Sequence, residues 1–268
     1  MEWGCFDVME QTRRYRAGNG TKEQPYEIWN EEEFIYFSFQ CMKETEYYYY
    51  VLRNDLDLSG YLWKPIGVWE SQLDNREWRR GFYGSFDGAM HQIKGIKLQV
   101  ETEKNELCCM GLFAMIGACQ PPDDKQPQAR NLQVQYDSQS CVLTAENTYY
   151  GGITGILYNG KIEHCLVTLN MIFVGEHVGL FAGGVAGIMR TPIVSGKRDS
   201  ARIQDTGFSG SMIATVKGQE TPKVYLGGIA GSMQTDHCVV KHCISRSFLH
   251  GSFTGKIAGS VLGGSIID

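Results

Sequence analysis

The sequence lacks a long apolar run, a secretory signal and an excess of basic residues. No stretch approaches the ~20 consecutive apolar residues that a membrane-spanning helix needs. The first residues, MEWGCFDVMEQTRRYR, lack the basic segment and apolar run of a secretory signal. With 25 basic and 30 acidic side chains, the net charge is -5. Neither membrane insertion nor a nucleic-acid partner is therefore expected, because nucleic-acid binding uses a concentrated basic face.

The cysteines do not follow a disulfide or zinc pattern. They stand at positions 5, 41, 108, 109, 119, 141, 165, 238 and 243, an odd number without a CxxC pair, which predicts reduced and mostly buried thiols. Such thiols suit a cytoplasmic or anaerobic setting. His237, Cys238, His242 and Cys243 form a cluster, but on a strand these side chains would divide between two faces. We therefore expect no metal site and no cofactor.

Proline is scarce, with 7 residues, whereas glycine is abundant, with 32, and this balance favours turns and strands over helices. A glycine-rich phrase recurs as GLFAMIG (111–117), GGITG (151–155), GLFAGGVAG (179–187) and GGIAG (227–231), with a looser copy in GKIAGSVLGG (255–264). The final glycines of the four clear copies lie 38, 32 and 44 residues apart. This unequal spacing predicts the coils of a β-solenoid rather than the blades of a propeller.

The segments that follow these phrases alternate apolar and polar residues, as half-buried strands do. They are ARNLQVQY (129–136), KIEHCLVTLNM (161–171) and VVKHCISRSFLHGSF (239–253). Two of them place a His-Cys pair at the same point, His164-Cys165 and His242-Cys243. Matching positions of a solenoid stack coil on coil, so a repeated packing position is the preferred interpretation of these pairs.

The N-terminal part has a different pattern. In NEEEFIYFSFQCMKE (30–44), an asparagine and three glutamates precede spaced apolar residues. Asn30 is predicted to cap a helix of two or three turns whose dipole favours the glutamates. We expect this helix to close one end of the solenoid and YYYYVLRNDLDLSG (47–60) to form its first strand.

The order of these segments resembles the GLUG-motif family, which includes bacterial surface proteins of the adhesin type and a region of IgA1-type metallopeptidases. The resemblance is carried by GNGTKEQPYEI (18–28), YYVLRNDLDLSG (49–60), WKPIG (63–67), FYGSFDGAMHQIKGIKL (82–98) and the glycine phrases. It implies an extracellular, right-handed parallel β-helix used for adhesion or for presenting another domain. The missing signal and the many cysteines depart from that pattern, so a cytoplasmic location stays open.

Two sets of acidic residues are candidates for catalysis. Asp55 and Asp57 share one face of a strand, and Asp87 lies in the FDG phrase; turn chemistry and side-chain-to-backbone bonds explain them without catalysis. Polygalacturonase-like enzymes need four ordered motifs, of which only Asp123-Asp124 and part of a Gly-His-Gly, His250-Gly251, are present. The metallopeptidase motif HExxH and the serine-hydrolase motif GxSxG are missing. The chain is predicted not to be an enzyme.

A charged insertion, WESQLDNREWRRG (69–81), separates two family phrases and is the candidate binding site. Tryptophan beside arginine suits stacking on sugar rings or a protein hot spot. The candidate residues are Trp69, Arg76, Trp78, Arg79 and Arg80, with the loop 120–129 as a second contact region. A fold in which the loop buries its own tryptophans is the alternative.

We therefore expect one all-β domain over residues 1–268, with a cap over 1–46 and the coils of a right-handed parallel β-helix over 47–268. The expected function is adhesion to, or binding of, a glycan or protein partner. A β-helix polysaccharide lyase or hydrolase is one alternative, and an intracellular or phage-borne assembly protein is the other. The strand-like C-terminus, GSVLGGSIID, shows no cap, which predicts an end-on contact or a further domain there.

Overall fold

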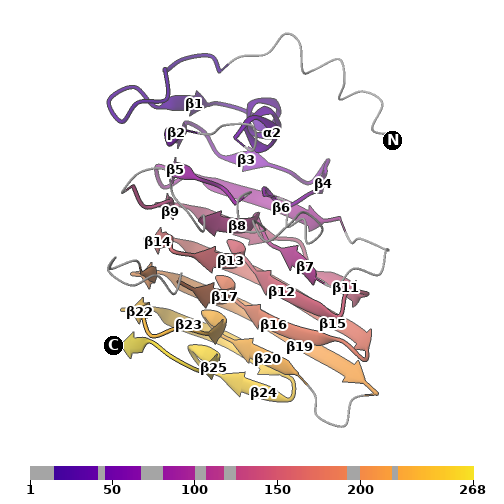
Figure 1. Ribbon diagram of the computed structural model, residues 1–268. Helices are drawn as coiled ribbons and strands as arrows, with labels where there is room; N and C mark the ends of the chain where they lie inside the picture. Colours follow the sequence, from indigo (N-terminus) through magenta and orange to yellow (C-terminus); the bar gives the residue numbers. More distant parts are fainter. Residues whose placement is uncertain are drawn as a thin grey trace, which may run out of the picture.

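The computed structural model describes residues 15–41, 46–67, 81–99, 107–117, 125–191, 200–218 and 223–268. Within these ranges the chain forms four sheets and one helix (Figure 1). Every strand pair recorded there is parallel. The predicted all-β class is thus confirmed.

Two sheets have eight strands each among the described residues. Sheet 1 consists of β1 (Tyr26–Ile28), β2 (Tyr48–Leu52), β5 (Gly84–Asp87), β9 (Gln128–Arg130), β14 (Lys161–Glu163), β18 (Ala201–Gln204), β22 (Cys238–Lys241) and β26 (Ser265–Ile267). Sheet 2 consists of β3 (Leu56–Asp57), β6 (Gln92–Leu98), β10 (Gln133–Tyr136), β15 (Leu166–Glu176), β19 (Gly207–Lys217) and β23 (Ile244–His250), with β4 (Leu62–Trp63) beside β6 and β11 (Gln139–Leu143) beside β15.

The other two sheets have five strands each in the same ranges. Sheet 3 consists of β7 (Leu107–Met110), β12 (Asn147–Gly151), β16 (Gly179–Gly183), β20 (Val224–Gly227) and β24 (Phe253–Gly255). Sheet 4 consists of β8 (Phe113–Gly117), β13 (Thr154–Tyr158), β17 (Ala186–Arg190), β21 (Ala230–Met233) and β25 (Ala258–Val261). From β14 onward the chain visits sheets 1, 2, 3 and 4 in the same order on each pass, so every pass adds one strand to each sheet.

The main core lies between the sheets and follows the alternation read from the sequence. In β15, buried and exposed residues alternate over the whole strand, and Val167, Leu169, Met171 and Phe173 face inward. The partner residues in β19 keep this register without a shift. Because side chains alternate between the faces of a strand, the other face of sheet 2 is open to solvent.

The glycine phrases form the turn between sheets 3 and 4. In GGITG, the apolar Ile153 is fully buried in the main core, while the last glycine, Gly155, lies against the backbone of Tyr149 and Met110. The first phrase, GLFAMIG, does not align with the others at its last glycine. In the register of β8 on β13, Phe113 pairs with Thr154 and Gly117 pairs with Tyr158. Ala114, not Gly117, therefore occupies the position that Gly155 has one coil later.

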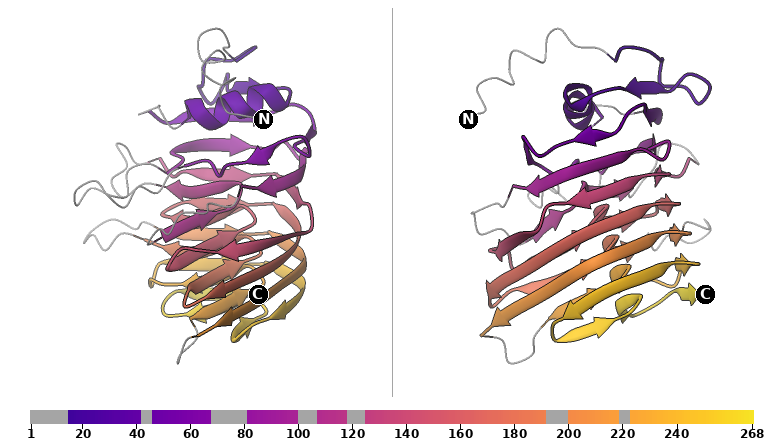
Figure 2. Two further views of the ribbon diagram at one scale, coloured as in Figure 1. Left: turned by 90° about the vertical axis from the view of Figure 1, so that its right-hand side faces the viewer. Right: turned by 180° about the vertical axis from the view of Figure 1, so that it is seen from behind.

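Helix α2 (Glu31–Gln40) covers one end of the stacked strands (Figure 2). As predicted, Asn30 caps it, with its side-chain oxygen accepting a hydrogen bond from the Glu33 amide at 2.9 Å. The rings of Phe34 and Phe37 are fully buried, and Phe34 stacks on Trp63 at 5.0 Å. The aromatic face of the helix thus closes the core at this end.

Sheet 1 begins one strand earlier than expected, because β1 precedes the helix and pairs with β2. The expected strand over 47–60 is divided into β2 and β3, which belong to different sheets. Within the described ranges, no helix has the length and apolar character needed to cross a lipid bilayer.

Candidate functional site

The binding residues predicted from the sequence, Trp69, Arg76, Trp78, Arg79 and Arg80, lie outside the described residues. The same holds for residues 120–124 of the loop 120–129, which include Asp123-Asp124. The site below is therefore built from other parts of the chain.

The three aspartates weighed as catalytic have structural partners. An oxygen of Asp57 accepts a hydrogen bond from the Ser59 amide at 3.0 Å, and one of Asp87 accepts from the Ala89 amide at 2.9 Å. Asp55 accepts from the Gln92 amide at 2.9 Å, and this bond is the largest cause of its lowered pKa. These are side-chain-to-backbone hydrogen bonds of the kind that the sequence predicts for these phrases.

The corner between sheets 1 and 2 brings side chains with reactive groups into one column. Asn131, His164, Asp205 and His242 each follow a strand of sheet 1 and have φ values of 51°, 52°, 47° and 49°. Asparagine, aspartate and histidine are the residues, apart from glycine, that most readily adopt this left-handed conformation. The corner conformation therefore selects the residue types of the column.

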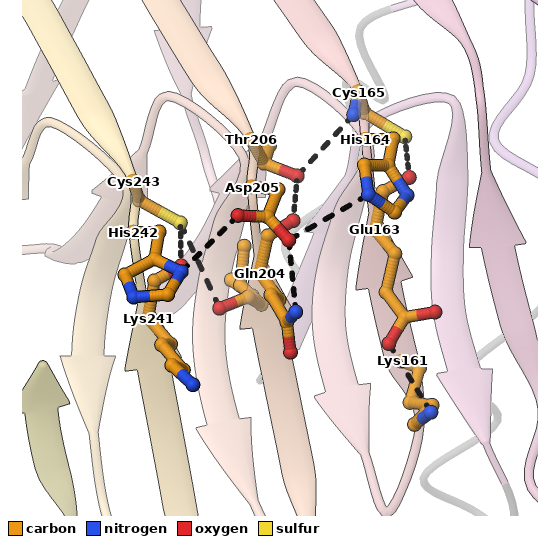
Figure 3. A network of polar contacts seen from close by, with 11 residues as sticks. Lys161, Glu163, His164, Cys165, Gln204, Asp205, Thr206, Lys241, His242 and Cys243 are labelled. Atoms are coloured by element: carbon orange, nitrogen blue, oxygen red, sulfur yellow. Dashed lines mark hydrogen bonds and ion pairs between the residues drawn. The ribbon is translucent and has the colours of Figure 1, made fainter.

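Asp205 lies between two histidines of the neighbouring coils (Figure 3). Its Oδ2 is 3.6 Å from Nε2 of His164, and its Oδ1 is 3.3 Å from Nδ1 of His242. The side-chain amide of Gln204 donates to Oδ2 at 2.8 Å. This hydrogen bond first, and the contact with His242 next, lower the pKa of Asp205 below its ordinary value of 3.8. The carboxylate is therefore favoured in its charged form and lies beside a histidine of each neighbouring coil.

The residue after each corner points inward. Cys165 is fully buried, and its thiol donates to the carbonyl oxygen of Glu163 at 3.2 Å. Two coils further on, the thiol of Cys243 donates to the carbonyl oxygen of Lys241 at 3.2 Å. In the coil between them, Thr206 occupies the same position. Burial raises the pKa of Cys165 to about 12. The repeated His-Cys pairs are thus a stacked packing position, as predicted, and the described residues contain no group of three or more side chains that could hold a metal ion.

Beside this column, the solvent-facing side of sheet 2 is hollowed. The consecutive strands β15, β19 and β23 place Leu166, Gly207 and Ile244 in one row. Leu166 and Ile244 are 55% and 60% exposed, and the glycine between them supplies no side chain. The result is an open groove of about 490 Å³ with aliphatic walls, within the size range of ligand sites. We call it the Gly207 groove.

Polar groups occupy both ends of the Gly207 groove. Asp205 and His242 of the corner column lie at one end. At the other end, the next outward-facing row consists of Thr168, Ser209 and Arg246, with the two hydroxyl oxygens 3.2 Å apart. A groove with aliphatic walls, hydroxyls and charges of both signs can hold an amphiphilic, polyhydroxylated ligand.

Sequence reasoning pointed to His242 but missed the groove. No motif marks it, because it depends on which residues of three distant segments become neighbours. The signal available was the alignment of the two His-Cys pairs, which places Leu166 and Ile244 at matching positions, two residues after each histidine.

Comparisons with known proteins bear on the fold alone. No protein-family model matches the chain, and a search of curated proteins finds no relative. A crystal structure from Bacteroides ovatus, of a protein provisionally assigned as an immunoglobulin A1 protease, matches with a TM-score of 0.50 over 94% of this chain and 76% of that one, at 20% identity. The chain is thus similar in fold to that protein over nearly its whole length.

Proposed function

We propose that this chain is a right-handed parallel β-solenoid of the GLUG type that acts as a non-catalytic binding module, with a glycan as its partner. The observation that carries the proposal is the Gly207 groove, whose aliphatic walls and polar ends suit a sugar chain. We place the module at the bacterial surface, on the basis of the family resemblance.

The order of the strands supports the solenoid. From β14 onward, each pass of the chain adds one parallel strand to each of the four sheets within the described ranges, and the glycine phrases mark the same turn in successive passes. Helix α2 at one end is the kind of cap that such repeats use.

The hydrogen bonds of the carboxylates support a non-catalytic module. Asp55, Asp57 and Asp87 each accept a hydrogen bond from a backbone amide, and Asp205 accepts one from the side chain of Gln204. An acid or base that serves a sugar-cleaving enzyme needs to reach the substrate, whereas these four groups already have partners within the chain.

Affinity electrophoresis through gels that contain neutral and acidic polysaccharides, followed by staining for degradation, tests the proposal. We expect one or more polymers to retard the chain without being cleared, and Gly207→Val to abolish the retardation because the valine side chain would occupy the space between Leu166 and Ile244. A Cβ on Gly207 would meet the flexible end of Leu166 at 3.0 Å and no closer atom, so the variant should fold. Leu62→Ala, at a 65% exposed position of β4, is the control.

Clearing of a polymer would replace this proposal by the lyase or hydrolase alternative. Failure of every polymer to retard the chain would contradict glycan binding. Retardation that persists in Gly207→Val would move the binding site away from the groove.

A second candidate function, end-on assembly, is favoured by the last coil. Its strands β23, β24, β25 and β26 each end a sheet in the described part of the chain. Val261 and Leu262 there are 50% and 76% exposed. Since helix α2 covers the opposite end, we propose that two copies of this chain meet through their last coils, because exposed strand edges favour pairing.

Light scattering coupled to size-exclusion chromatography tests this assembly. We expect a concentration-dependent dimer that Leu262→Asp weakens and that Leu62→Asp, at the exposed position near the capped end, leaves intact. A chain that stays monomeric at every concentration would contradict it.

A further inference from the structure

We propose that the Gly207 groove is specific for acidic saccharides, and that Arg246 pairs with the carboxylate of a sugar acid bound there. This inference rests on the proposed function and adds the chemical class of the ligand.

Arg246 differs from Lys94 and Lys97, two other cations on the outward face of sheet 2. Lys94 is 3.3 Å from an oxygen of Asp57, and Lys97 is 3.3 Å from one of Asp137. In the part of the chain that the structure describes, Arg246 makes neither an ion pair nor a side-chain hydrogen bond, although it lines the groove. A guanidinium presents a planar set of donors that matches a carboxylate with two parallel hydrogen bonds.

The groups around Arg246 suit the rest of a sugar. Thr168 and Ser209 are its neighbours in the same row and offer hydroxyls. Leu166 and Ile244 form walls against which the C–H face of a pyranose ring can pack. A bound saccharide would thus meet a cation, hydroxyls and aliphatic surface in one hollow of about 490 Å³.

The sheet favours a saccharide over a peptide. Strand β19 pairs with β15 on one side and β23 on the other, so its backbone groups are used by the two ladders. A peptide on this face would leave its own backbone groups without backbone partners, which is costly where water is excluded. The hydroxyls of a sugar can instead bond to the side chains of Ser209 and Thr168.

Calorimetric titration with matched oligosaccharides tests the inference. The probes are uronic-acid oligomers from polygalacturonate, alginate and hyaluronate, each paired with its carboxyl-reduced form, which keeps the sugar but removes the charge. We expect at least one acidic oligomer to bind at least about tenfold more tightly than its reduced form, since a hydrogen bond to a charged group is roughly twice as strong as a neutral one.

Variants connect this preference to one residue. Arg246→Gln should remove the preference, and Arg246→Lys should restore part of it. Lys217→Gln removes a cation at the far end of β19 and should leave the preference unchanged. Unchanged circular dichroism and melting temperature would show that each variant is folded.

The outcomes separate this inference from the function on which it rests. Equal binding of acidic and reduced oligomers, lost in Gly207→Val, would overturn the role of Arg246 and leave glycan binding in place. A preference that survives Arg246→Gln would overturn the inference too. If no oligosaccharide binds, or if a pentapeptide with a free C-terminal carboxylate binds in their place, both proposals fail.

Discussion

The carbonyl oxygen of Gly155 lies directly against the Cα of Gly187 in the next coil. A Cβ placed on Gly187 would be 2.5 Å from that oxygen and 2.7 Å from the backbone nitrogen of Tyr150. The contact recurs, because a Cβ on Gly231 would lie 2.5 Å from the carbonyl oxygen of Gly187. In the GGITG, GLFAGGVAG and GGIAG phrases, the last glycine therefore allows sheets 3 and 4 to lie in close contact.

This close approach predicts that adding a single methyl group at Gly187 destabilises the fold. Gly187→Ala should lower the free energy of unfolding by about 1–3 kcal/mol, because backbone must move to admit the Cβ. Gly60→Ala is the control, since a Cβ there would meet nothing within 4 Å. Urea denaturation measures both variants. Equal stability of the two would show that the coils are not held in close contact by glycine.

The buried hydroxyl of Tyr150 predicts a substitution that does not lower the stability of the fold. Tyr150 is fully buried, and its hydroxyl has no hydrogen-bond partner among the described residues. Tyr150→Phe should therefore leave the stability unchanged or raise it, because an unpaired buried polar group is unfavourable. Tyr136 is the matched control: its hydroxyl donates to the carbonyl oxygen of Gly152 at 2.9 Å.

Thermal and urea unfolding of the two variants measure this difference. Tyr136→Phe should lower the free energy of unfolding by about 0.5–1.5 kcal/mol, the net contribution of one hydrogen bond. A larger loss in Tyr150→Phe than in Tyr136→Phe would mean that the Tyr150 hydroxyl does have a partner, such as a buried water.

The corner column predicts a pH dependence. Hydrogen bonding by Gln204 and then His242 holds the pKa of Asp205 below 3.8 in the folded chain. Its stabilising contribution is therefore complete above the unfolded pKa and is lost as pH falls through the folded one. Asp205→Asn should lower stability at neutral pH, and the difference from the wild type should shrink in acid.

Urea denaturation from neutral pH down to about pH 2.5 follows this linkage. Asp236→Asn, at an exposed carboxylate without an ion pair in the described part of the chain, should show no such convergence. A difference between wild type and Asp205→Asn that stays constant with pH would exclude linkage through this carboxylate.

The sequence predicts that residues at the corner between sheets 1 and 2 stack in register, but it does not predict which residue types occupy each coil. His164-Cys165 and His242-Cys243 are recognisable as matching pairs, and the structure confirms their register through β18. The pair that lies between them, Asp205-Thr206, differs from both in residue type, so the sequence alone does not mark it as a third copy. The corner requires only a residue that tolerates a positive φ and then a small group that can bond to backbone, and aspartate with threonine meets both needs.

The groove could not be predicted because it depends on long-range register. Leu166, Gly207 and Ile244 are 41 and 37 positions apart, and they become neighbours only when three strands pair without a slip. Shifting one strand by a single residue would turn its side chains to the other face. The unequal loops between the glycine phrases hide this register, as the misplacement of Gly117 in the first phrase also illustrates.

Burial of the thiols predicts their order of reaction. Burial raises the pKa of Cys141 to about 11 and that of Cys165 to about 12, and only the thiolate reacts with alkylating agents. Both should resist iodoacetamide in the folded chain at pH 8 and react once urea unfolds it. Cys108 and Cys109 are half-buried and should react before Cys141 and Cys165. Timed alkylation with peptide mapping measures the order, and modification of Cys165 as fast as Cys108 in the folded chain would contradict the packing of the corner column.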